Sequence, residues 1–269
     1  MMTDFFLYDF LGRALIAGLL LGILAPLVGQ FLVVRRFSLL ADTLSHVSLL
    51  GVALAVFFQF PIFIGALIAS LLGGLGMEIL RRSGKVMSES VLALFLSGSL
   101  ALALVMLAVS DGVNVNLLSY LFGSITTVTA ADLGTLSVLL GGAIIFLFFG
   151  YRRLFLLSLD EDLASVSGVS TSRYNTLFIL LASAVVAGAL TVVGALLIGA
   201  LMVIPVLAAM QWRRSFLETL FLGIGLTELA VVTGFFVSYQ LNLPSGATIV
   251  LCALALFVIS YGINIKKPD

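Results

Sequence analysis

Residues 14–36 read ALIAGLLLGILAPLVGQFLVVRR, an uncharged run from Ala14 to Val34 that is followed by Arg35 and Arg36. A helix needs about 20 apolar residues to cross the hydrocarbon core of a bilayer. Basic residues next to such a helix are retained on the cytoplasmic side. The run therefore predicts a transmembrane helix that ends at the cytoplasmic surface.

Apolar runs of the same kind fill the chain. Of its 269 residues, 62% are hydrophobic and 10% are charged, and the net charge is zero. Soluble domains carry about 25% charged residues, so the composition excludes a soluble globular protein. A net charge of zero gives no reason to expect nucleic acid as a partner. We predict an all-α, polytopic membrane protein with nine spans, eight or seven being the alternatives. The predicted spans are residues 14–34, 40–60, 62–80, 91–109, 133–150, 176–192, 193–210, 216–239 and 247–265.

The basic residues predict the orientation of the chain. All 13 lysines and arginines except Arg13 fall on one side of this arrangement, next to the ends of alternate spans. The positive-inside rule then places the N-terminus outside and the C-terminus in the cytoplasm. The spans leave no room for a separate soluble domain, so residues 1–269 are predicted to form one transmembrane domain. Residues 151–173 form its one sizeable cytoplasmic loop.

Residues 176–210 make the number of crossings hard to predict. They contain no charged residue, and as one helix they would extend about 52 Å. That is too long for one crossing and tight for two. The basic residues at both ends demand an even number of crossings. A tight hairpin near residues 188–194, or a re-entrant pair of broken helices, satisfies both conditions.

Small residues recur every fourth position along the first span, at Ala14, Gly18, Gly22 and Pro26. This spacing lets two helix backbones approach closely. Two interpretations follow: packing within the subunit, or contact between subunits.

Asp42 and His46, the latter the only histidine of the chain, lie four residues apart. On a helix this spacing puts both side chains on one face, and Ser45 and Ser48 add polarity beside them. A carboxylate oxygen and an imidazole nitrogen supply half of a site for a first-row divalent metal. Spacing alone leaves three interpretations. Asp42 caps a helix and His46 bonds to a neighbour, the pair relays protons, or the pair binds a metal transiently in a translocation pathway.

Glu228 lies in the middle of the predicted span 216–239. Ionisable residues inside spans are costly and usually face the protein interior or a water-filled path. Glu228 is therefore a further candidate metal ligand, a partner for His46, or a polar contact between helices. The acids Glu78, Glu89 and Glu218 lie near the basic cytoplasmic ends, where we expect local salt bridges.

The cytoplasmic loop contains an acidic segment with the signals of a short helix. Ser158 and Glu161 have the spacing of a capping box, and Asp160, Glu161 and Asp162 crowd the predicted first turn, where the helix dipole favours negative charge. Gly168 suits the end of such a helix. The helix either lies at the membrane interface without a partner or docks a cytoplasmic protein.

The chain shows no machinery for catalysis of its own. No G-x-x-x-x-G-K-[ST] phosphate-binding loop occurs, since residues 83–86 read SGKV. No Ser–His–Asp set is arguable, and Cys252 is the only cysteine, which excludes a disulfide framework.

Outside the membrane, residues 117–124 form an amphipathic run suited to the interface or to an extracellular partner.

Several segments together resemble the metal-uptake ABC permeases of the zinc/manganese class. The segment ADTLSH at 41–46 looks most like zinc-uptake permeases of Gram-positive bacteria. The segments occur in order over nearly the whole chain, which makes the combination specific. The others are the surrounding run 35–53, YLFGS at 120–124, VSGV at 166–169, VGALL at 193–197 with Pro205 downstream, and LPSGA at 243–247.

The resemblance implies a multi-pass permease of the bacterial cytoplasmic membrane that forms a homodimer. It also implies two cytoplasmic ABC ATPase subunits docked on the dimer and an extracellular metal-binding protein that delivers the ion. On this sequence, Asp42 and His46 fall on the family's candidate metal-pathway segment, and residues 160–168 fall on the segment expected to meet the ATPase. Glu228 has no comparably clear motif.

The expected function is the membrane-spanning part of an ATP-driven importer for Zn²⁺, with Mn²⁺ or Fe²⁺ as alternative ions. No permanently bound cofactor is expected, and ATP is hydrolysed by the partner subunit. The chain lacks the histidine-rich loop of some zinc systems, which leaves zinc against manganese open. The alternative from another class is a proton-coupled secondary transporter in which Asp42 and His46 relay protons. A third is a membrane assembly subunit that transports nothing.

Overall fold

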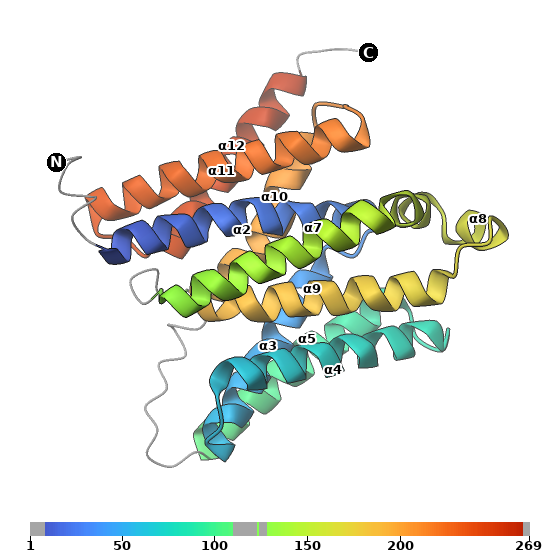
Figure 1. Cartoon of the computed structure of the whole chain (residues 1–269), viewed down its shortest axis with the longest axis horizontal. Coiled ribbons are helices and arrows are strands. Elements are labelled where there is room, and N and C mark those ends of the chain that lie inside the picture. Colours follow the sequence, from blue (N-terminus) through green and yellow to red (C-terminus); the bar gives the residue numbers. More distant parts are fainter. Residues whose placement is uncertain (1–8, 110–122, 124–127, 266–269) are drawn as a thin grey trace.

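The computed structural model describes residues 9–109, 123 and 128–265, and these residues form helices and no strand (Figure 1). The all-α prediction is confirmed. The predicted amphipathic run 117–124 lies, apart from Gly123, outside the described residues. The described helices are α2 (Asp9–Val34), α3 (Leu39–Phe58), α4 (Ile62–Arg82), α5 (Ser88–Val109), α7 (Ala130–Leu159), α8 (Glu161–Val166), α9 (Thr171–Val193), α10 (Ala195–Met210), α11 (Phe216–Leu241) and α12 (Ser245–Ile265).

Eight of the described helices are long and apolar enough to cross a membrane. The apolar helix α10 has only 16 residues, about 24 Å of helix against a hydrocarbon core of about 30 Å. The nine predicted spans therefore correspond to eight full-length helices and one short helix. The orientation of the termini stays a prediction.

Gly194 alone separates α9 from α10. Its φ of +83° lies in a region that residues with a side chain rarely adopt, and its N–H donates to the Leu190 carbonyl at 3.0 Å. The long uncharged stretch thus folds as two helices joined by a tight turn. This turn lies within the predicted hairpin 188–194.

The small residues of α2 pack against α11, which lies beside α2 (Figure 1). A Cβ built on Gly18 would lie 2.9 Å from Val231 Cγ1, and one built on Gly22 would lie 2.8 Å from Glu228 Cδ. Both distances are too short for a real Cβ. For these two glycines the first interpretation, packing within the subunit, is the one that the structure shows.

The predicted loop 151–173 is mostly helical, because α7 continues through Leu159 and α9 begins at Thr171. The capping box predicted between Ser158 and Glu161 is wrong. Ser158 lies in the last turn of α7, where its Oγ donates to the Leu154 carbonyl at 2.7 Å. Asp160 has extended backbone between the two helices and caps α8 in place of Ser158.

Candidate functional site

Asp42 and His46 lie in the first two turns of α3. The chain turns between α2 and α3 at Arg36, which has a positive φ of 59°, and Ser38 is the N-cap residue of α3. Asp42 is the fourth residue of the helix and therefore lies beyond the cap position. The interpretation of Asp42 as the helix cap does not fit this placement.

A cavity of about 640 Å³ lies beside these two side chains, between α3, α5, α10 and α12. Asp42 is exposed to it and His46 is half-buried. Every other described residue that lines the cavity is uncharged. The lining residues are Ser38, Leu39, Asp42, Ser45, His46, Leu96, Ala195, Leu196, Gly199, Ala200, Val203, Ile204 and Val250.

The cavity offers an oxygen donor and a nitrogen donor on one helix face. The Nδ1 atom of His46 is buried and has no hydrogen-bond partner in the part of the chain that the structure describes. The Ser45 hydroxyl donates to the Ala41 carbonyl at 3.0 Å, so its proton is held within the helix. No group of three or more His, Cys, Asp and Glu residues suited to a metal occurs in the described part of the chain. Within the described residues, one copy of the chain therefore offers two candidate ligands at this place.

Glu228 lies in a different part of the molecule. Its carboxylate packs against Gly22 of α2, and both carboxylate oxygens are buried without a hydrogen-bond partner among the described residues. Glu228 is not among the residues that line the cavity beside Asp42 and His46. Of the alternatives, this placement matches the contact between helices. A ligand role for Glu228 stays a prediction.

The three acids near the basic helix ends have different roles. Glu78 forms the predicted ion pairs, with Arg81 at 2.8 Å and with Arg82 at 2.7 Å. Glu218 caps α11 in a capping box with Ser215. For Glu89 no ion pair occurs among the described residues.

On the side predicted to be cytoplasmic, Glu161 of α8 binds three other segments of the chain. Its Oε1 accepts hydrogen bonds from Arg35 Nη2 at 2.9 Å and from Asn175 Nδ2 at 3.0 Å. Arg81 Nη1 lies 3.4 Å from Oε2. These partners belong to the α2–α3 turn, to α9 and to α4, so one carboxylate ties α8 to three elements.

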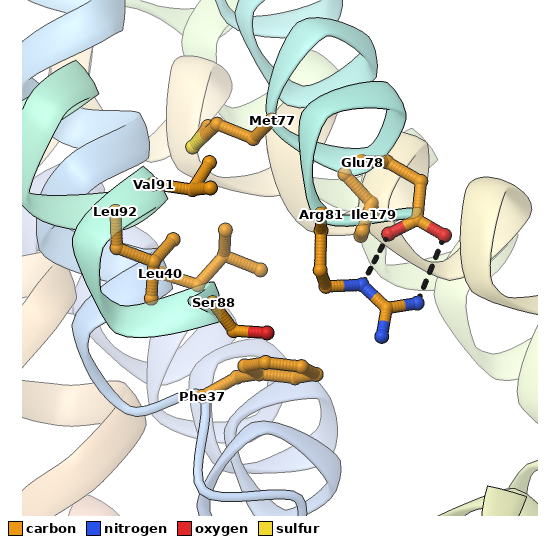
Figure 2. A pocket seen from close by; sticks show the side chains of 9 residues that line it. All are labelled: Phe37, Leu40, Met77, Glu78, Arg81, Ser88, Val91, Leu92 and Ile179. Carbon is orange, nitrogen blue, oxygen red and sulfur yellow. Dashed lines mark hydrogen bonds and ion pairs between the residues drawn. The ribbon is translucent and has the colours of Figure 1, made fainter. Parts of the chain in front are cut away.

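Arg81 links this contact to a second carboxylate. Figure 2 shows the guanidinium of Arg81 facing the carboxylate of Glu78 through two contacts, with the Phe37 ring nearby. The Arg81 and Arg35 guanidinium carbons lie 5.6 Å and 5.4 Å from the centroid of the Phe37 ring, within the range of a cation–π contact. Every charge at the centre of this cluster is therefore paired.

The pairing changes the pKa of Glu161. Burial alone would raise the pKa of this carboxyl group, because it disfavours the charged form. The positive charges of Arg81 and Arg35 and the Asn175 amide outweigh burial and lower the pKa below its ordinary value. Glu161 is therefore ionised at neutral pH.

The helix α8 presents apolar side chains on its outer face. The Asp160 carboxylate accepts hydrogen bonds from the backbone N–H groups of Asp162 and Leu163, at 2.8 and 3.0 Å. Gly168, with φ +80°, ends the helix as predicted. Leu163 is 54% exposed and Val166 is 89% exposed.

Residues 7–264 match the family model described as the ABC 3 transport family. The chain belongs to this family. It is the permease subunit of a metal ABC importer and a multi-pass protein of the bacterial plasma membrane. The predicted resemblance is thus confirmed.

Relatives of this ABC 3 permease include importers of two metals. It is 32% identical over 265 residues to the manganese import system permease protein ScaB of Streptococcus parasanguinis. This alignment covers 97% of this chain and 92% of the relative. It is 32% identical over 253 residues to the high-affinity zinc uptake system membrane protein ZnuB of Buchnera aphidicola subsp. Acyrthosiphon pisum, with 94% and 95% covered. The solved structure of PsaBC from Streptococcus pneumoniae in complex with Fab matches with a TM-score of 0.85 at 30% identity, over 97% of this chain and 95% of that chain.

Sequence reasoning about this permease missed the partners of Glu161. Asn175 and Arg35 bind Glu161 from positions 14 and 126 residues away. Gly199, which lines the cavity opposite Asp42, carried no signal beyond being a glycine in an apolar helix. Of these three residues, the sequence analysis singled out only Arg35, as one of the basic residues next to the first span.

Proposed function

We propose that the permease carries Zn²⁺ through the cavity beside Asp42 and His46, as the membrane subunit of an importer driven by a separate ATPase. The observation that carries this proposal is the placement of both side chains on one cavity wall, where every other lining residue that the structure describes is uncharged. A divalent ion needs ligands that replace its hydration shell before it can pass the hydrocarbon region. An imidazole suits zinc, and a carboxylate suits zinc and manganese.

A second copy of the chain would complete the site. Each copy contributes one carboxylate and one imidazole, and a homodimer with both pairs on its shared pathway offers four ligands. Four-coordination by nitrogen and oxygen is common for Zn²⁺. Ligands drawn from two subunits can separate when the dimer changes conformation, which lets the ion leave.

Mn²⁺ is the second candidate ion. The 32% identity to a manganese import permease over 97% of this chain favours it as much as the zinc relative favours Zn²⁺. A carboxylate is a suitable ligand for both ions, so only a measurement of transport can distinguish between them.

The ATPase contact belongs on α8. Leu163 and Val166 are exposed apolar side chains on the side predicted to be cytoplasmic, where lipid tails do not cover them. Asp160 caps the helix, and Glu161 ties it to the α2–α3 turn that leads into the helix of Asp42. Movement of α8 imposed by ATP binding would therefore reach α3 directly.

The test is uptake of radiolabelled Zn²⁺ and Mn²⁺ into proteoliposomes that contain the permease, its cognate ATPase and the loaded metal-binding protein, with and without ATP. We expect ATP-dependent uptake of Zn²⁺ in preference to Mn²⁺. A preference for Mn²⁺ would change the ion in the proposal and leave the proposed pathway unchanged. Uptake by the permease alone under a pH gradient would refute the ATPase-driven mechanism in favour of proton coupling.

A further inference from the structure

Gly199 of α10 stands directly opposite Asp42 in the cavity wall. A Cβ built on Gly199 would overlap the Asp42 Oδ1 atom, and it would lie 3.1 Å from Cγ and 3.9 Å from Cα of the same residue. The last distance is an ordinary van der Waals contact. The backbones of α3 and α10 thus leave room for a methyl group at position 199, and only the carboxylate of Asp42 occupies that room.

Other glycines at helix contacts differ from Gly199 in what they face. A Cβ on Gly29 would overlap the backbone of Met202, and one on Gly51 would overlap the backbone of Gly65. Those glycines let two helix backbones approach each other. At Gly199 the nearest atoms belong to Asp42, so this glycine accommodates a functional side chain.

We infer that Gly199 is a positioning residue for metal transport: the space left by its missing side chain holds the Asp42 carboxylate on the cavity wall, beside His46. This inference rests on the proposed function, in which Asp42 and His46 bind the ion. A metal ligand pair works only when its donor atoms are held within about 0.5 Å of the productive geometry. A methyl group at position 199 would force the carboxylate into another rotamer and separate it from the position it now shares with His46.

The experiment compares Gly199→Ala with Gly225→Ala in the complete transporter reconstituted with its ATPase and loaded binding protein. A Cβ on Gly225 of α11 meets nothing within 4 Å, which makes it a matched control in a neighbouring helix. We expect Gly199→Ala to reduce the maximal rate of ATP-dependent Zn²⁺ or Mn²⁺ uptake by about 10- to 100-fold, the usual effect of losing a group that orients a metal ligand. The KM for the loaded binding protein should not change, because that protein docks on the outer face. Gly225→Ala should transport like the wild type.

A double-mutant cycle on the Tm of the purified permease separates positioning from general damage to the fold. Because the displaced atom is the far end of an exposed, flexible side chain, we expect Gly199→Ala to change the Tm little, both in the wild-type background and in an Asp42→Ala background. An equal loss of Tm in both backgrounds, or full uptake by Gly199→Ala, would overturn the positioning role. Normal uptake by Asp42→Ala would instead refute the proposed function, so the two failures are distinguishable.

Discussion

Among the described residues that line the cavity between α3 and α10, Asp42 and His46 are the only charged or titratable side chains, whereas Glu161 on α8 binds two arginines and an amide. In the first region, the Nδ1 atom of the His46 imidazole has no hydrogen-bond partner within the described residues, and Asp42 is exposed to the cavity. The second region pairs its charges with one another and surrounds them with Phe37. Both regions consist of ionisable groups near or within the membrane.

In the proposed function, the ionisable residues of the first region bind a metal ion, whereas those of the second region hold segments of the chain together. A carboxylate that is already paired with arginine gains little from a cation, whereas a carboxylate without such a pair has more to gain. The connection between the regions is short, since Arg35 lies seven positions before Asp42 in the chain. The paired cluster is therefore placed to carry a movement of α8 to the unpaired site.

The largest expected effect comes from removing the unpaired ligands. Asp42→Ala and His46→Ala should each lower ATP-dependent metal uptake by more than about a hundredfold, because changes outside the ligand shell already cost about 10- to 100-fold. Both variants should assemble with the ATPase, since neither side chain is part of the ion-pair cluster. Uptake in proteoliposomes and co-purification of the ATPase measure the two quantities. Normal uptake by both variants would show that metal transport does not need the Asp42 and His46 side chains, and would contradict the contrast between the two regions.

A smaller effect is expected in the paired region. Glu161→Gln keeps the shape of the side chain and removes its charge, which weakens the contacts to Arg35 and Arg81. Changes within a coupling network alter the coupling free energy by about 0.5–2 kcal/mol, so uptake per ATP hydrolysed should fall by about twofold to thirtyfold. The ratio of uptake to ATP hydrolysis in proteoliposomes measures this loss. Glu89→Gln, an exposed acid on the same predicted side, is the control and should keep the wild-type ratio.

Glu228→Gln tests whether a third carboxylate belongs with the unpaired region. The Glu228 side chain fills the space beside Gly22, and glutamine fills it equally without a charge. Because Glu228 is not among the residues that line the cavity beside Asp42 and His46, metal uptake should stay close to that of the wild type. Loss of uptake with normal assembly would show that Glu228 acts as a ligand.

The smallest effect concerns pH. Because the native contacts lower the pKa of Glu161, its ionised form stabilises the folded chain at neutral pH. This contribution is present above the ordinary carboxyl pKa of about 4.3 and is lost as the pH falls through the lowered native value. The side chain is 42% exposed, so the gain is at most about 1 kcal/mol. The Tm difference between wild type and Glu161→Gln should be present at pH 7 and vanish in acid. A difference that persists in acid would contradict the electrostatic origin.

Much of the fold could be predicted because membrane spans are a local property. Long uncharged runs bounded by arginine predict helices wherever they occur, and Gly194 marks the one break in residues 176–210 that allows a turn. The end of α7 was predicted nine residues too early, since residues 151–159 mix aromatic, basic and apolar side chains in a pattern that fits a loop and a helix alike. The pair Asp42–His46 was found because four-residue spacing is itself helical geometry.

The sequence by itself determined that this protein is helical, lies in a membrane, carries one Asp–His pair on a single helix face and has no ATP-binding loop of its own. Only the tertiary structure decided that this face meets Gly199 of α10 and that Glu228 meets Gly22 of α2. It also decided the contacts of Glu161, which are with Arg35, Arg81 and Asn175. Helical periodicity states which residues share a face, because it depends on neighbours a few positions apart. Which face meets which depends on packing between separate segments, 157 residues apart for Asp42 and Gly199 and 206 apart for Gly22 and Glu228, and no local pattern records these contacts.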